Sequence, residues 1–322
     1  MSAVFALNTS EAGPSNGHKA GCKKEVPGAK LFVTGSTFNR FDQNTSDLDI
    51  TVELEEPPTN PFAIYEKCTE VYGKMCLELA NVIGLRGVRT GKCPLIRLQN
   101  KALKFDIELN FSGSTAVRNS FLFRLVADFD RRVPKLACVL KKWAREKNLM
   151  DSFNGLLSTY GLLNLLVYYL QRKPVPVLPY FFAMIPDLAT REIAELCLVC
   201  DANELRKKWR DSSEMVMPFT LADLLIEFFQ FYKDFDFGAN VISIRSRGAP
   251  HVSTFKKGVA CRCEHLRCEK SGITIEEPFG RYSIHPMCEQ RSNAGKLFNA
   301  ACNQAFDALS ESRNLHSIGI YY

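Results

Sequence analysis

Two stretches of the chain place acidic side chains close to a glycine and a serine. Gly35-Ser36 ends a short apolar run, and Asp47 follows Ser36 after 11 positions, with Asp49 two residues further on. Residues two apart on a β-strand point to the same face, so the carboxylates of Asp47 and Asp49 are expected together. Asp106 lies on a second alternating segment, and it adds a third carboxylate if the two strands are neighbours.

Three carboxylates this close repel one another unless a cation neutralises them. Oxygen ligands suit Mg²⁺ or Mn²⁺, and two such ions stabilise the attacking and leaving oxygens of a phosphoryl displacement. The Gly35-Ser36 turn offers backbone N–H groups and a hydroxyl to a triphosphate. These residues predict a two-metal phosphoryl-transfer site. Asp-x-Asp alone is typical of a solvated strand face, and the preceding turn favours the metal site.

The elements that must position these residues follow from periodicity. The runs 31–33, 48–54 and 104–109 predict strands, and shorter strands are expected near Val88 and at 94–98. Apolar residues at helical spacing over 62–82 predict a helix. Further helical patterns occupy 119–147, 156–172, 190–209, 220–235 and about 292–312, with short strand-like runs at 241–244 and 273–275. A sheet-bearing first half and a helical second half predict an α+β fold.

The composition excludes several classes of protein. The 322 residues are 46% hydrophobic with a net charge of +6, which is ordinary for about two globular domains and excludes a disordered chain, a collagen or a coiled coil. No run reaches the ~18 apolar residues of a membrane span, and residues 1–10 lack the features of a signal peptide. The 12 cysteines are expected as reduced thiols, which predicts a cytoplasmic protein, with the nucleus as the alternative.

The segments 31–36 and 46–49 resemble the DNA polymerase β-like nucleotidyltransferases. Motifs in the second half narrow the resemblance to the atypical cytoplasmic poly(A) polymerases and terminal uridylyltransferases. These motifs are Arg118–Leu122, Leu140–Ala144, Leu157–Gly161 and Ile275–Phe279. Tyr169-Leu170-Gln171 followed by 176–179 is most similar to the germline-type cytoplasmic poly(A) polymerases. The resemblance covers about residues 28–310.

The resemblance implies a two-lobed nucleotidyltransferase. A palm-like mixed β-sheet domain over 29–118 would follow a flexible tail at 1–28. A mainly helical central, PAP-associated domain would fill 119–322, with an irregular insertion at 246–270. The implied activity is template-independent addition of nucleotides to RNA 3′ ends by a two-metal mechanism. An inactive adaptor and a small-molecule nucleotidyltransferase are the alternatives, and the intact aspartates and the nucleotide-binding motifs argue against both.

The resemblance also assigns roles to residues. The β- and γ-phosphates would be held by Gly35 and Ser36. The metals would be held by Asp47, Asp49 and Asp106. Asp106 would also activate the RNA 3′-hydroxyl.

The nucleotide-binding residues complete this set. The resemblance implies that Asn119 contacts the ribose. Lys141 would contact the triphosphate, with Arg145 one helical turn further on. Thr159 and Tyr160 would contact the base, on which the tyrosine stacks. Glu277 belongs to the acidic-Pro-Phe motif that precedes the base-facing segment. Each assignment has a structural alternative. Asn119 could simply start a helix, Lys141 and Arg145 could lie on a solvated basic helix face, and Tyr160 could be a buried core residue.

The choice of base depends on the segment after that motif. Uridylyltransferases usually carry a histidine before an asparagine there, whereas this chain has Ser292 before Asn293, which favours ATP. His285 lies in an apparent insertion at 280–291 and could enter the pocket instead. Addition of uridine, or of alternating uridine and guanosine, therefore stays an alternative.

A group of cysteines with one histidine lies in the segment 246–270. Cys261, Cys263, His265 and Cys268 could bind zinc, but their spacing is tighter than the usual paired pattern. The favoured interpretation is a basic surface loop that contacts RNA phosphates. The sequence shows no RRM, KH or C₂H₂ pattern, so we expect a separate RNA-binding or scaffold partner to choose the RNA.

Overall fold

A computed structural model describes most of the chain from residue 29 onward. The described residues are 29–41, 47–54, 60–79, 83–89, 94–100, 106–111, 113–151, 156–193, 195–196, 201–211, 219–248, 272–279, 284–286 and 293–321. They belong to two compact units, one ending at Leu125 and including Glu192–Asp201, the other formed by Val126–Arg191 and Ala202–Tyr322. The predicted tail at 1–28 and the cysteine-histidine group lie outside the described residues, and the predicted domain boundaries stay predictions.

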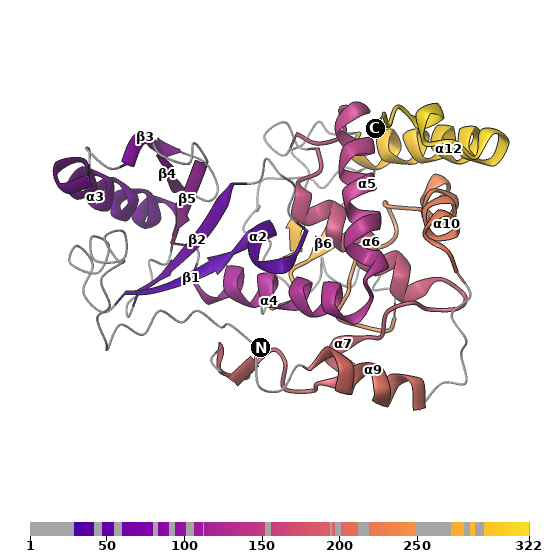
Figure 1. Ribbon diagram of the computed structural model, residues 1–322, viewed down its shortest axis with the longest axis horizontal. Coiled ribbons are helices and arrows are strands. Elements are labelled where there is room, and N and C mark those ends of the chain that lie inside the picture. The colour runs from indigo at the N-terminus through magenta and orange to yellow at the C-terminus, as the bar shows by residue number, and fades with distance from the viewer. Residues whose placement is uncertain are drawn as a thin grey trace. The chain divides into compact units, whose positions relative to one another are not determined.

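The first unit is built on a five-stranded mixed sheet (Figure 1). In spatial order its strands are β1 (Lys30–Thr34), β2 (Leu48–Glu53), β5 (Asp106–Asn110), β4 (Leu95–Asn100) and β3 (Ile83–Arg89). β2 and β5 run parallel, and the other neighbours are antiparallel. The strands predicted from alternation are confirmed, and the central parallel pair brings together the two strands that carry the aspartates.

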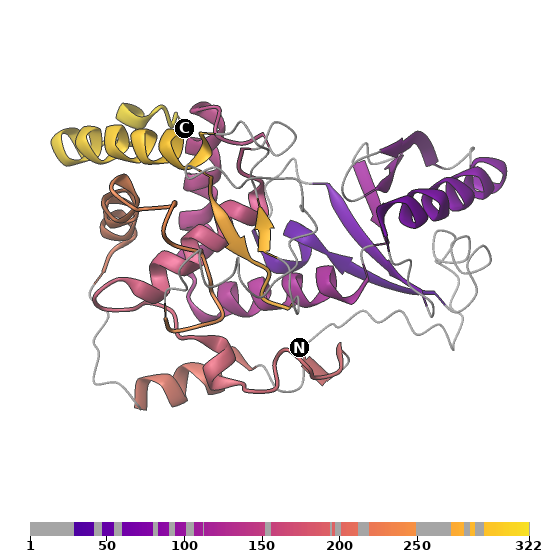
Figure 2. The same cartoon turned by 180° about the vertical axis from the view of Figure 1, so that it is seen from behind.

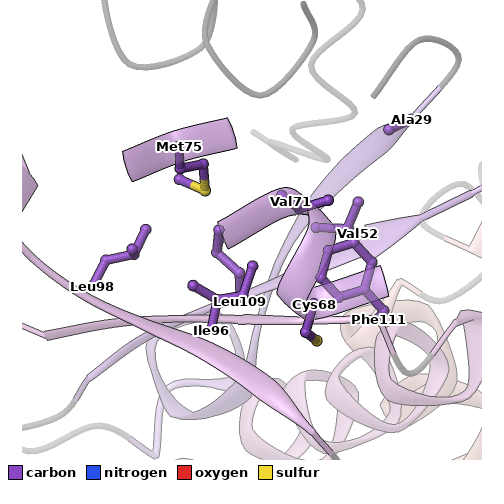
Figure 3. Close-up of a cluster of buried hydrophobic side chains, with 9 residues drawn as sticks. All are labelled: Ala29, Val52, Cys68, Val71, Met75, Ile96, Leu98, Leu109 and Phe111. Carbon is purple, nitrogen blue, oxygen red and sulfur yellow. The ribbon is translucent and has the colours of Figure 1, made fainter. Parts of the chain in front are cut away.

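Helix α3 (Pro61–Leu79) supplies the apolar layer that packs on this sheet. The Asn60 side chain accepts a bond of 2.9 Å from the Ala63 N–H, and proline at the first helical position is pre-set for a helix start. Figure 3 shows the core that results. Its buried residues are Ala29, Val52, Cys68, Val71, Met75, Ile96, Leu98, Leu109 and Phe111. The predicted helix over 62–82 is confirmed to Leu79.

Helices form the second unit. They are α5 (Arg132–Glu146), α6 (Thr159–Arg172), α7 (Phe181–Met184), α9 (Ala202–Asp211), α10 (Leu221–Lys233), α12 (Ala294–Ser312) and the 3₁₀ turn η1 (Leu315–Ile318). Aromatic rings fill the core, where Phe298 of α12 lies 5.8 Å from Trp143 and 5.6 Å from Tyr232 between ring centroids. Figure 2 shows α12 beside α10, whose side chains share this core. No described helix is both long and apolar enough to cross a membrane.

The helical pattern over 119–147 is two helices rather than one, which corrects the prediction. α4 (Ser114–Phe129) ends before Asp130, and α5 starts at Arg132. Pro134 has no N–H to donate to the carbonyl of Asp130, and its ring would clash with that carbonyl in a continuous helix. The Asp130 carboxylate instead accepts the Arg132 N–H at 2.8 Å, which fixes the start of α5.

A two-stranded sheet completes the second unit. β6 (Thr274–Glu276) pairs with β7 (Ile284–Pro286), a strand that lies inside the predicted insertion at 280–291. The predicted strand at 241–244 is reduced to an isolated bridge, in which Ile242 pairs with Ile275. β6 is the element that holds the acidic-Pro-Phe motif, because Glu277 follows it directly.

Candidate active site

The carboxylates gather where β2 and β5 run side by side. Asp47 directly precedes β2, Asp49 lies within it, and the parallel register places Asp49 opposite Glu108. Asp106 and Glu108 are two apart on β5, so they share a face. The prediction that the two aspartate-bearing strands are neighbours is confirmed.

Burial and the neighbouring carboxylates raise the pKa of Asp47 and of Asp49. Burial, then Glu108 and Asp47, raise the pKa of Asp49 to about 6, against the opposing effect of a hydrogen bond from the Ser36 backbone N–H. The pKa of Asp47 is also raised, by burial first and then by Glu108, while Arg97 lowers it. The part of these shifts that comes from like charges would be relieved by a bound cation.

Two arginines, from β4 and from the edge strand β3, partly compensate this charge. Arg97 on β4 donates from Nε to Glu108 Oε1 at 3.0 Å and from a second nitrogen to the same oxygen, and it lies 3.9 Å from Asp47 Oδ2. Arg86 on β3 lies 3.4 Å from Asp106 Oδ1. The sequence motifs did not assign Glu108 to the site. Nothing in the local pattern pointed to Arg97.

The donor set suits the divalent cation that this type of site implies. Carboxylate oxygens are the ligands Mg²⁺ and Mn²⁺ prefer, and Asp47, Asp49, Asp106 and Glu108 supply them. Within the described residues, no group of three metal-ligating side chains converges closely enough to hold an ion as it stands. The side chains fit the ion in their chemistry, because all four supply carboxylate oxygens.

The Gly35-Ser36 turn packs directly against this cluster. β1 leads into the short helix α2 (Gly35–Asn39), and Thr34 at the end of β1 pairs with Asp49. Gly35 has φ +65°, and a Cβ at this position would lie 1.9 Å from Asp49 Oδ2. Only glycine meets both conditions, since other residues avoid this backbone region and any side chain would displace the carboxylate. The Ser36 N–H already bonds to Asp49, which leaves its hydroxyl as the group to offer a phosphate.

Asn119 lies on α4, the helix next to this turn. Its side-chain oxygen is buried and has no partner within the described part of the chain. The following residue, Ser120, bonds to the backbone of Gly35. Asn119 is thus on the element that contacts the proposed phosphate turn, while its contact with a ribose stays a prediction.

The second unit brings together two further predicted residues. Tyr160 lies in the first turn of α6, whose N-cap Ser158 accepts the Gly161 N–H at 3.1 Å. The Tyr160 hydroxyl donates to Glu277 Oε2 at 3.0 Å, across 117 positions of sequence. Tyr160 is half-buried, so it is not one of the core tyrosines such as Tyr168. The bond holds the hydroxyl end of the ring, and stacking of Tyr160 on a base stays a prediction.

The remaining predicted residues lie in different environments. Lys141 is only 2% exposed on α5, whereas Arg145, one turn further, is exposed. Thr159 is half-buried as the first residue of α6. The roles of these three residues, and the convergence of groups from the two units on one nucleotide, stay predictions.

Solved structures with the same fold define the class. The structure of the GLD-2/RNP-8 complex matches with a TM-score of 0.69 at 23% identity, covering 93% of this chain and 87% of that chain. A cytoplasmic RNA terminal U-transferase matches with a TM-score of 0.69 at 21% identity, covering 93% and 88%. The chain therefore has the two-domain fold of the polymerase β-like nucleotidyltransferases.

Sequence comparisons match two parts of the chain to family models. Residues 19–128 match the central palm domain of mitochondrial-like poly(A) RNA polymerases, and residues 220–282 match the Cid1 family poly A polymerase model. The resemblance to the atypical poly(A) polymerases and terminal uridylyltransferases that the motifs indicated is confirmed over these two segments.

Individual relatives are named poly(A) RNA polymerases. Poly(A) RNA polymerase GLD2-B of Xenopus laevis is 28% identical over 294 residues, covering 91% of this chain and 54% of the relative. Mouse poly(A) RNA polymerase GLD2 is 29% identical over 260 residues, covering 79% and 50%. The chain thus spans about half the length of these relatives.

Proposed function

We propose that this chain is an RNA 3′-terminal nucleotidyltransferase that adds AMP from ATP. One observation carries the proposal. The neighbouring strands β2 and β5 carry Asp49 and Asp106, Asp47 directly precedes β2, and Asp49 lies against Gly35 of the Gly35-Ser36 turn, within a nucleotidyltransferase fold. Carboxylates beside a phosphate-binding turn are the groups that in-line phosphoryl transfer requires.

The residues of the chain then divide the work. Bound Mg²⁺ or Mn²⁺ would neutralise the attacking and leaving oxygens and orient them in line. Asp47 and Asp49 would hold the ions, and Asp106 would accept the proton of the RNA 3′-hydroxyl. The Ser36 hydroxyl would bind the phosphates of the nucleotide.

Residues of the second unit would bind the rest of the nucleotide. Lys141 and Arg145 would contact the triphosphate. The ring of Tyr160, held by Glu277, would stack on the base, an interaction worth about 1–3 kcal/mol for any base. Selectivity must therefore come from groups other than the stacking ring.

The preference for ATP is supported by the relatives, which are named poly(A) RNA polymerases. Addition of uridine is the second candidate. It is supported by the RNA terminal U-transferase among the structures with the same fold. Ser292 lies outside the described residues, as does the side chain of His285. The nucleotide experiment below distinguishes the two candidates.

The test is incubation of the purified chain with a short RNA, Mg²⁺ or Mn²⁺, and each nucleoside triphosphate alone and mixed. We expect elongation with ATP, and a loss of at least about 100-fold in the Asp47→Ala/Asp49→Ala variant, since the metal ligands contribute several kcal/mol. Glu311→Ala, an exposed acidic residue on α12, is the control. If the double variant tails RNA at the rate of the parent, the activity does not come from these aspartates. That result would refute the proposed enzymatic function and favour the inactive adaptor.

A protein partner that chooses the RNA is a further part of the proposal. It is supported by the relative whose structure was solved as a GLD-2/RNP-8 complex. Co-purification of the tagged chain with an RNA-binding protein would test it, and strong RNA selectivity of the isolated chain would contradict it.

We also propose that the protein works in the cytoplasm. The described cysteines, Cys68, Cys76, Cys138 and Cys302, form no disulfide bond with one another, as expected in a reducing compartment. Imaging of a fluorescent fusion tests this, and exclusion from the cytoplasm would contradict it.

A further inference from the structure

One face of α4 contacts both ends of the phosphate turn. Ser120 and Arg124 are four residues apart on this helix, so their side chains lie one above the other. Ser120 contacts Gly35 at the start of α2, and Arg124 contacts Phe38 near its end. All four residues belong to the first unit.

The contact at the start of the turn is a partly buried hydrogen bond. The Gly35 N–H donates to the Ser120 hydroxyl oxygen at 3.0 Å, across 85 positions of sequence. Ser120 is 7% exposed, so no bulk solvent replaces the acceptor if the hydroxyl is removed. The bond fixes the residue at which any Cβ would collide with the Asp49 carboxylate.

The contact at the end of the turn involves a charge. Arg124 donates from Nη1 to the Phe38 carbonyl at 2.9 Å, and its guanidinium carbon lies 5.9 Å from the centre of the Phe38 ring. The neighbouring Phe123 packs edge-on against Phe41, with ring centroids 6.2 Å apart. A cation at the carbonyl end of a helix also complements the helix dipole.

Helix α2 needs such support. It has five residues, and a helix this short is not stable by itself. Its N-cap residue, Thr34, makes no side-chain capping bond. Since the Ser36 N–H bonds to the Asp49 carboxylate, any displacement of α2 moves both the proposed phosphate ligand and a proposed metal ligand.

We propose that Ser120 and Arg124 are positioning residues that clamp the Gly35–Asn39 turn and thereby set the affinity for the nucleotide. Neither residue is expected to touch substrate. The proposal rests on the proposed function, because it takes the turn to be the triphosphate-binding element. It adds two residues that the sequence motifs did not single out for this role.

The test combines kinetics with hydrogen exchange on the full chain. Ser120→Ala removes the acceptor, Ser120→Thr keeps it, and Ser114→Ala removes an exposed hydroxyl from the same helix as a matched control. For Ser120→Ala we expect KM for ATP to rise about 5- to 10-fold with kcat within about twofold, the size expected for one buried hydrogen bond. The Gly35 amide should exchange at least about tenfold faster, while Ser120→Thr and Ser114→Ala keep both parental values.

Arg124 is tested in the same way. Arg124→Met keeps the aliphatic stem and removes the donors, and it should raise KM by a similar factor and speed exchange of the α2 amides. Unfolding temperatures report any general destabilisation. Such destabilisation would lower kcat and speed hydrogen exchange throughout the first unit rather than at the turn alone.

Two outcomes overturn the clamp. The first is a Ser120→Ala variant that keeps the parental KM and the parental exchange rate at Gly35. The second is a variant in which kcat falls while KM is unchanged. Either result would show that the bond does not position the turn. An inactive parental chain would instead refute the proposed function. In that case faster exchange at Gly35 in Ser120→Ala would still support the clamp, and unchanged exchange would refute it.

Discussion

Asp49 shows how a single carboxyl group depends on its neighbours. Its strand position faces Glu108, its carboxylate lies against Gly35, and burial together with the nearby carboxylates raises its pKa to about 6. The ionised form is therefore disfavoured in the folded, metal-free protein. This has a consequence for stability that can be measured without any substrate.

In the absence of metal, ionisation of Asp49 should destabilise the folded chain. The pKa is 3.8 for an ordinary aspartate and about 6 in the folded protein. The folded state thus binds more protons between these values, and stability falls as the pH rises from about 4 to about 6. Urea unfolding with a chelator, compared between the parent and Asp49→Asn, should show a smaller decline over this range for the variant. Equal slopes for the two proteins would contradict this prediction.

Arg97 offers a second prediction at the level of residues. It pairs with Glu108 and lies near Asp47, so it competes with a cation for these carboxylates. Arg97→Met should bind Mn²⁺ several-fold more tightly than the parent, and Glu108→Gln several-fold more weakly, because each changes the local charge by one unit. Titration with Mn²⁺ measures both. Lys67→Met, which disrupts an exposed ion pair on α3, is the control. Weaker Mn²⁺ binding by Arg97→Met would contradict the competition.

Among the elements, α6 shows how one helix end organises a distant segment. Arg172, its last residue, donates to the carbonyls of Ser243, Ser246 and Gly248 at 3.0–3.2 Å and to that of Arg247 at 2.7 Å. Its guanidinium also lies 4.3 Å from the centre of the Tyr168 ring. The planar fork of arginine allows several such bonds at once, which a lysine ammonium cannot reproduce.

Arg172→Lys should therefore lower the free energy of unfolding by about 2–4 kcal/mol, since several charge-assisted hydrogen bonds are lost. Urea unfolding measures the loss, and hydrogen exchange should show faster exchange at residues 243–248. Arg191→Lys is the matched control, because its guanidinium pairs with Asp187 in a partly exposed i,i+4 arrangement worth about 1 kcal/mol or less. An equal effect of the two variants would contradict the role assigned to Arg172.

For the whole molecule, the important feature is that each unit has its own core. α3 and the sheet enclose the core that contains Met75, whereas Trp143, Tyr232 and Phe298 pack in the second unit. Separate cores predict that the two units respond separately to core truncation.

Phe298→Ala should lower the stability of the second unit by about 3–5 kcal/mol, the usual effect of truncating a buried phenylalanine. Hydrogen exchange should then accelerate in α10 and α12 and stay parental in β1–β5. Met75→Ala is the reciprocal variant, with faster exchange in α3 and the sheet. Loss of protection throughout the chain in either variant would show a single cooperative unit instead.

Local patterns predicted much of this molecule. Alternation predicted the strands that carry Asp49 and Asp106, because side-chain direction in a strand depends only on the parity of the position. Helical spacing predicted α3, α10 and α12 to within a few residues. The motifs also indicated the family, since their types and order can be read along the chain.

Other features depended on contacts between residues far apart in sequence, which no local period encodes. The β2–β5 register placed Glu108 opposite Asp49, and β4 supplied Arg97. The fold brought Tyr160 to Glu277 and Ser120 to Gly35. The residue types of the site were thus determined by the sequence alone. Only the tertiary structure decided which groups compensate their charge and hold their backbone, because those groups come from separate elements that meet only when the chain packs.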